Sequence, residues 1–297
     1  MRSVVFRNAV VAAALLLAAG LAADEGPNRP KIYGIAFVRL KSSDFQKASE
    51  TYSKILGLGT GKYRGTNGCT NVKDPCYLVN ARQHIELVPG HAGDPGSWLE
   101  EFGFETASAR VMRDYLEGDH IAFVQPPRAP SESAPGPTQV SSSLVHTGFV
   151  AKDLYTLNKF YLDTLGFRLY WKGGFKELPP GTPEKDSDID WFEIQVPDGS
   201  DWVEYMLNIP RRADHQELGA QNHFCLGVRS MQKAIDQLRK NGLAPDSKLA
   251  DDKPDIGRDG KWQYDIFDPD LTRIELMEPT PAKDPCCNPY TAPHPTL

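Results

Sequence analysis

The feature that most constrains the fold is an internal repeat, in which two segments 109 residues apart share one layout. One segment begins at Phe37 and the other at His146. Each places Asp, Tyr and Leu-Gly at 7, 15 and 19–20 positions further on, without a gap. Such self-similarity indicates that one structural unit is built more than once. The first position separates the copies, because an imidazole can bind a metal ion and a phenyl ring cannot.

Each copy predicts the same local structure. An apolar stretch of β-forming residues (32–40 and 144–150) precedes an Asp at a helix N-cap position, and a run with helical periodicity follows and ends at Gly. Three strand-like segments come next. In the second copy they are 168–171, 191–196 and 202–207, with a hairpin turn at 197–199. The unit is therefore strand–helix–strand–strand–strand.

A third copy begins at His223 and a shortened fourth at Glu101. The third predicts a helix at 231–240 and strands at 261–267 and 272–277, so the second and third copies form one complete pair. The fourth keeps a helix at 108–116 and a strand at 120–124, but its middle strands are missing. We therefore expect an α+β fold of paired βαβββ modules in which the N-terminal pair is truncated.

The chain also predicts clear boundaries. Residues 1–23 combine a basic start, an apolar run too short for a bilayer and small residues, which is the pattern of a signal peptide. We expect a degenerate N-terminal domain at 30–125, a Pro/Ser-rich linker at 126–143, a C-terminal domain at 144–279 and a Pro-rich tail without a core at 280–297. The protein is thus expected to be secreted or periplasmic and free of the membrane after cleavage. Its net charge of −6, without a basic stripe, argues against nucleic-acid binding.

The chain has five cysteines, which an oxidising compartment would allow to form disulfides. Cys69 and Cys76 bracket a Gly/Asn/Pro-rich stretch and could close a short loop as a disulfide. Cys286 and Cys287 are adjacent, an arrangement that pairs only under strain, and Cys225 lies in an apolar strand as a small buried residue.

Four potential metal ligands occupy equivalent places in the C-terminal pair. His146 and His223 open the first strand of their copies, and Glu204 and Glu275 lie in the last strand. A lone His or Glu at such a place is usually structural or faces solvent, but four in repeat-related places indicate a metal site. Imidazole and carboxylate suit Zn, Ni, Mn, Co or Fe(II), and four ligands leave two positions open on an octahedral ion.

The equivalent places in the N-terminal pair are Phe37, Glu86, Glu101 and Ala122. Two carboxylates without an imidazole make a poor transition-metal site. We therefore expect no complete metal site in that half.

The repeat, the His/Glu/His/Glu order and the segments 267–270 and 273–279 resemble the vicinal oxygen chelate superfamily. Its members include glyoxalase I, methylmalonyl-CoA epimerase, extradiol dioxygenases and the fosfomycin and bleomycin resistance proteins. The resemblance is loose over 32–125 and close over 144–279. It implies a metal-dependent lyase or isomerase that acts on a small molecule with neighbouring oxygens. Glu275 is then the candidate base and Glu204 the second candidate.

Residues two positions from a ligand share its face of the strand. Arg273, Trp202 and Met206 are therefore expected substrate contacts, although Arg273 could equally form a structural ion pair and the other two could line the core.

Two alternatives remain. One is an Fe(II)-dependent extradiol-type dioxygenase in which Glu204 is not a ligand, and the other is a protein that binds a metal or small molecule without turnover. The truncated N-terminal pair leaves strand edges exposed, so a homodimer is a further hypothesis.

Overall fold

The computed structural model describes residues 28–61, 69, 74–91, 94, 98–116, 122–125, 136–176, 178–179, 181–208 and 215–297, with the backbone alone at 215–217. The predicted signal peptide at 1–23, residues 126–135 of the predicted linker and residues 120–121 of the strand predicted at 120–124 lie outside the described residues.

The N-terminal half forms a six-stranded sheet in the order β2-β3-β4-β1-β5-β6. Its strands are β1 (Ile32–Ser42), β2 (Gly59–Thr60), β3 (Cys76–Leu78), β4 (His84–Pro89), β5 (Leu99–Thr106) and β6 (Ala122–Val124). Helix α1 (Phe45–Ser49) continues as a π-helix (Glu50–Ile55), and α2 (Ala109–Tyr115) connects β5 to β6. The fourth copy therefore contributes only β5 and β6 to the described sheet, as the missing middle strands predicted.

The C-terminal half forms an eight-stranded sheet in the order β12-β13-β14-β11-β7-β10-β9-β8. The second copy supplies β7 (Leu144–Val150), β8 (Arg168–Gly173), β9 (Trp191–Gln195) and β10 (Trp202–Met206). The third copy supplies β11 (His223–Gly227), β12 (Asp255–Ile256), β13 (Trp262–Phe267) and β14 (Arg273–Met277). The helices are α3 (Leu154–Asn158) with a π-helical continuation (Lys159–Thr164), a 3-10 turn (Asp186–Asp188), α4 (His215–Gln221) and α5 (Met231–Asn241). The two copies are related by an approximate twofold axis between β7 and β11, because β7 is parallel to β10 and β11 is parallel to β14.

The helix N-cap residues and the helix-terminating glycines that the sequence predicted are present in both halves. Asp44 and Asp153 accept hydrogen bonds from backbone N–H groups in the first turns of α1 and α3. Gly57 and Gly166 end the helical segments with φ of +69° and +72°, values that favour glycine.

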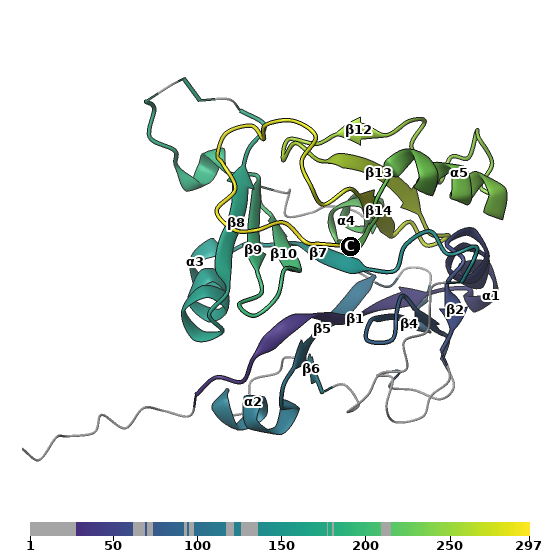
Figure 1. Ribbon diagram of the computed structural model, residues 1–297, viewed down its shortest axis with the longest axis horizontal. Helices are drawn as coiled ribbons and strands as arrows, with labels where there is room; N and C mark the ends of the chain where they lie inside the picture. The colour runs from purple at the N-terminus through teal and green to yellow at the C-terminus, as the bar shows by residue number, and fades with distance from the viewer. Residues whose placement is uncertain are drawn as a thin grey trace, which may run out of the picture.

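The two sheets share a hydrophobic core and lie against one another (Figure 1), with contacts between β1 and β7. Buried polar contacts join them. Gln83 donates from Nε2 to the carbonyls of Ile35 (2.9 Å) and Leu144 (2.7 Å), and Asp201 accepts from the Ile35 backbone N–H at 2.9 Å. Among the residues that the structure describes, no helix is long and apolar enough to cross a membrane.

The structure corrects one expectation outside the repeat and shows how the cysteines pair. The tail does not lie apart from the core, because Tyr290, Ala292 and Leu297 pack against buried residues of the C-terminal sheet. In Figure 1 the yellow C-terminal segment runs in front of β8–β10. Cys286 and Cys287 pair with each other, and Cys69 pairs with Cys76, which leaves Cys225 as the free cysteine.

Candidate metal centre

The central strands of the eight-stranded sheet place the four predicted ligands together. Cys225 of β11 lies opposite His146 of β7 and opposite Glu275 of β14, and Gly148 lies opposite both His223 and Glu204. Because alternate residues share a face of a strand, all four ligand candidates project from one face of the sheet.

Three of these side chains form a tight triangle. The Nε2 atoms of His146 and His223 lie 3.0 Å apart, and Glu275 Oε2 lies 3.4 Å from the first and 3.2 Å from the second. All three residues are buried, with at most 3% of their surface exposed.

The triangle fits a divalent cation. Ligand atoms about 2.0–2.2 Å from such an ion, at tetrahedral or octahedral angles, lie roughly 3.0–3.4 Å from one another. His223 donates from Nδ1 to the Gln221 carbonyl at 2.9 Å, which leaves the lone pair on Nε2 to face the triangle. The second oxygen of Glu275, Oε1, is buried and has no hydrogen-bond partner among the described residues. A bound cation would coordinate His223 Nε2 and would neutralise the buried carboxylate of Glu275.

Glu204 lies at the edge of the triangle. One of its oxygens is 3.3 Å from His223 Nε2, and it forms a second possible ligand group with His146 and His223. Burial raises the pKa of Glu204 well above its ordinary value, and the charges of Glu193 and Glu275 raise it further. Burial acts on Glu275 in the same sense, but its contacts with the two histidines and the charge of Arg273 outweigh it, and the pKa of Glu275 lies well below the ordinary value. The two carboxylates are therefore not equivalent.

The histidines are held neutral. Burial lowers the pKa of His223 to about 4, with a further contribution from the Arg273 charge, and burial also lowers the pKa of His146. A neutral imidazole is the form that binds a metal.

The three predicted substrate contacts have different surroundings. Arg273 NH2 lies 2.7 Å from His223 Nε2 and 3.6 Å from Glu275, and its NH1 lies 3.3 Å from Asp265. Trp202 is fully buried with its ring 4.7 Å from the His146 ring, so it supports the ligand. Met206 is buried opposite Trp191.

A cavity of about 100 Å³ adjoins the cluster. Its walls include Trp171, Trp191, Glu204, Arg258, Arg273 and Glu275. Of the three predicted contacts, Arg273 alone lines it. Both carboxylates of the cluster and two guanidinium groups thus surround the space that a small molecule would enter.

Next to the cluster lies a buried charged group that the sequence pattern did not predict. Lys261 has no exposed surface, and its Nζ lies 3.3 Å from Asp259 and 3.9 Å from Glu193. The rings of Trp202, Tyr170 and Tyr290 surround Nζ at 4.3–4.8 Å. The 197–199 hairpin places Glu193 opposite Glu204, so the position of Glu193 beside the cluster could have been predicted from the sequence. Lys261 and Tyr290 belong to a loop and to the tail, whose positions no periodicity fixes.

In the N-terminal sheet the two carboxylates at the ligand-equivalent places form ion pairs with an arginine. Arg39 is 3.0 Å from Glu86 and also pairs with Glu101, the two carboxylates at the ligand-equivalent places. Phe37 stacks on His84 with ring centroids 5.4 Å apart. The described part of this half thus neutralises its two carboxylates with a side chain.

Glycine is required beneath one ring in each sheet. A Cβ at Gly148 would lie 2.1 Å from Cε1 of His223, and a Cβ at Gly103 would lie 2.2 Å from the Phe37 ring. In each sheet, a ring at the start of one copy's first strand therefore packs against a glycine of the neighbouring strand.

Comparisons with known proteins agree with this geometry. Residues 143–276 match the Glyoxalase/Bleomycin resistance protein/Dioxygenase superfamily. The match covers the C-terminal domain, and the predicted resemblance to this superfamily is confirmed there. No curated protein sequence matches the chain significantly.

Several solved structures similar to this chain are 2,3-dioxygenases. The 2,3-dioxygenase LapB from Pseudomonas sp. KL28 has a TM-score of 0.60 at 13% identity, over 86% of this chain and 96% of that one. Homoprotocatechuate 2,3-dioxygenase from Brevibacterium fuscum, in complex with 3,4-dihydroxyphenylacetate, has a TM-score of 0.58 at 15% identity, over 91% and 84%. The Arthrobacter globiformis enzyme has a TM-score of 0.58 at 14% identity, over 84% and 80%. At these identities the likeness shows the α+β fold of paired modules.

Proposed function

We propose that the C-terminal domain binds Fe(II) and catalyses the ring-cleaving dioxygenation of a small aromatic molecule with two neighbouring hydroxyl groups. The observation that carries this proposal is the triangle of His146, His223 and Glu275, with distances of 3.0–3.4 Å between the donor atoms. Two imidazoles and one carboxylate on one face of an ion are typical of non-haem Fe(II) oxygenases. The fold likeness to dioxygenases adds support as an analogy.

The residues around the triangle would perform the remaining tasks. When bound, the metal would supply a site where the diol and O₂ meet, and both oxygen atoms would enter the opened ring. Glu204 lines the cavity, so its carboxyl group is placed to exchange a proton with a diol hydroxyl. Arg273 and Arg258 offset the negative charge of the ionised diol, and Trp171 and Trp191 form apolar walls.

A second candidate is the metal-dependent lyase or isomerase that the sequence suggested first. It is favoured by the 3.3 Å separation of Glu204 from His223, which would allow Glu204 to serve as a fourth ligand. We further propose that the protein works in an oxidising compartment outside the cytoplasm, because disulfides such as its two pairs persist there.

The test is to load the protein with Fe(II) under anaerobic conditions, add catechol or 3,4-dihydroxyphenylacetate, and then admit O₂. A dioxygenase consumes one O₂ for each ring opened, and the product is followed by its visible absorbance. Turnover without O₂ uptake, by protein loaded with Zn, Ni, Mn or Co, would favour the lyase or isomerase. Metal binding with no turnover of any diol would leave a binding protein.

A further inference from the structure

The C-terminal segment Cys286–Leu297, here called the strap, crosses the same face of the sheet that carries the ligand cluster. It packs through Tyr290, Ala292 and Leu297 on a buried group formed by Val145, Tyr170, Trp202, Cys225 and Met277. Trp202 supports His146, and Cys225 lies opposite His146 and Glu275, so the strap rests directly beside the cluster.

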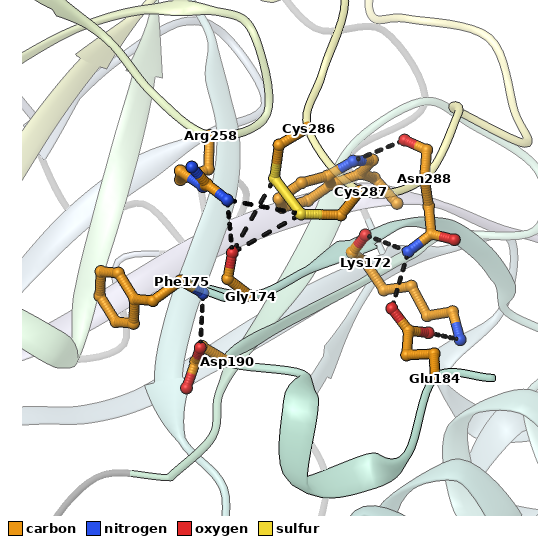
Figure 2. The surroundings of a disulfide bond; sticks show 10 residues. Lys172, Gly174, Phe175, Glu184, Asp190, Arg258, Cys286, Cys287 and Asn288 are labelled. Atoms are coloured by element: carbon orange, nitrogen blue, oxygen red, sulfur yellow. Dashed lines mark hydrogen bonds and ion pairs between the residues drawn. A yellow bond between two sulfur atoms is a disulfide. The ribbon is translucent and has the colours of Figure 1, made fainter. Parts of the chain in front are cut away.

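The strap is anchored at its start by the pair of adjacent cysteines. Cys286 Sγ and Cys287 Sγ lie 3.9 and 3.6 Å from the Gly174 carbonyl oxygen, which also accepts a hydrogen bond from Arg258 at 3.0 Å (Figure 2). Asn288 donates to the Lys172 carbonyl at 3.1 Å. Gly174 and Lys172 belong to the β8 edge and Arg258 to the β12–β13 loop, so the disulfide sits where the two edges of the sheet meet.

Further contacts fix the strap across the opening between these edges. The Thr291 N–H donates to the Tyr170 carbonyl at 2.9 Å, and the Tyr290 hydroxyl donates to the Asp259 carbonyl at 2.7 Å. The Tyr170 hydroxyl lies 2.7 Å from Nδ1 of His294. The strap is thus bonded both to β8 and to the loop that precedes β13.

The space left beside the cluster is small. Its volume of about 100 Å³ compares with roughly 300–1,000 Å³ for ordinary small-molecule sites. Three residues of its wall are bonded to the strap. Trp171 donates from Nε1 to the Asn288 carbonyl at 3.0 Å, the Asp259 carbonyl accepts from the Tyr290 hydroxyl at 2.7 Å, and Arg258 NH2 lies 3.7 Å from Cys287 Sγ. The strap therefore holds in place residues that line the cavity, although it does not line the cavity itself.

We propose that the strap determines the specificity of this site by fixing its walls: it keeps the cavity small enough to restrict the ligand to a single small ring, and the Cys286–Cys287 disulfide holds the strap in place. The inference rests on the proposed function for the identity of the ligand. It predicts that loosening the strap admits larger diols without strengthening the binding of small ones.

The test combines two measurements on the full chain. The first is the rate at which a maleimide labels Cys225, the free cysteine beneath the strap, which requires no metal. The second is calorimetric binding of catechol and of the two-ring 2,3-dihydroxybiphenyl to metal-loaded protein under anaerobic conditions. The variants are Tyr290→Ala and the double change Cys286→Ser with Cys287→Ser. The controls are Tyr290→Phe, which keeps the ring, and Cys69→Ser with Cys76→Ser, which removes the distant disulfide.

In the two strap variants we expect Cys225 labelling to accelerate at least tenfold and the two-ring diol to bind, with catechol affinity unchanged within about threefold. Both controls should behave as the wild type. Unchanged labelling and continued exclusion of the larger diol in both strap variants would overturn the inference. If wild-type protein binds no diol at all, the proposed function fails instead, and the labelling rates alone decide whether the strap closes this face. If Tyr290→Ala does not fold, the cysteine variant decides.

Discussion

Replacing Asp201 with Asn should make the difference in stability between variant and wild type depend on pH. Asp201 precedes β10, and its Oδ2 accepts from the Ile35 backbone N–H of β1, so it joins the two sheets. Burial raises its pKa from 3.8 to about 7, and the Ile35 hydrogen bond opposes this only in part. Since the folded protein holds this proton more tightly than the unfolded chain, the contribution of Asp201 to stability is full below pH 3.8 and is lost as the pH rises through 7.

The size of the effect follows from these two pKa values. Between pH 5 and pH 8 the wild type loses at most about 2.5 kcal/mol through Asp201, at 1.36 kcal/mol per pKa unit. The value is an upper bound, because part of the residue remains in contact with solvent. An amide at this position keeps an acceptor for Ile35 and does not titrate. The unfolding free energy of the variant relative to that of the wild type therefore increases by this amount as the pH rises.

The assay is urea unfolding of both proteins at pH 5 and pH 8. Glu193 and Asp265, whose pKa values burial raises to about 8 and about 7, titrate in both proteins, so the comparison uses the difference in unfolding free energy between them. A difference that stays constant between pH 5 and pH 8, or one that grows in favour of the wild type, would refute the reasoning.

Two further substitutions test the surroundings of the site. Gly148→Ala should push the His223 ring away from the triangle, because the new Cβ would lie 2.1 Å from Cε1. Metal affinity, measured by competition with a chromogenic chelator, should therefore fall about 10–100-fold. Lys261→Met should lower the free energy of unfolding by about 3–5 kcal/mol, because it leaves the buried carboxylate of Asp259 without its cation. Unchanged affinity in the first variant, or unchanged stability in the second, would contradict these assignments.

The repeat explains why so much of the fold could be predicted from the sequence. Each N-cap Asp and each terminal Gly acts within one turn of the chain, so Asp44, Asp153, Gly57 and Gly166 mark helix boundaries without help from tertiary structure. The alternation of strands then places equivalent residues of two copies on one face. For this reason the repeat alone was enough to predict that the two histidines and the two glutamates of the C-terminal pair converge.

The remaining features of the fold and the site depend on tertiary contacts, which no local sequence pattern predicts. The strap has no periodicity, and its position follows from the pairing of Cys286 with Cys287 and from the packing of Tyr290 beside Lys261. Helix α4 likewise has no counterpart in the repeat, and the two residues of β12 are too few to show an alternating pattern in the sequence. The different roles of Glu204 and Glu275 do not follow from their equivalent positions, because they arise from which carboxylate completes the triangle with the two histidines.

The most direct test of the central claim is the metal content of Glu275→Gln and Glu204→Gln beside the wild type, measured by plasma mass spectrometry after anaerobic loading with Fe(II) and gel filtration. Both substitutions remove one buried carboxylate of similar size, so each serves as the control for the other. A site built on His146, His223 and Glu275 predicts about one iron per chain in the wild type and in Glu204→Gln, and loss of iron in Glu275→Gln. Iron retained in Glu275→Gln, or absent from all three proteins, would contradict the account.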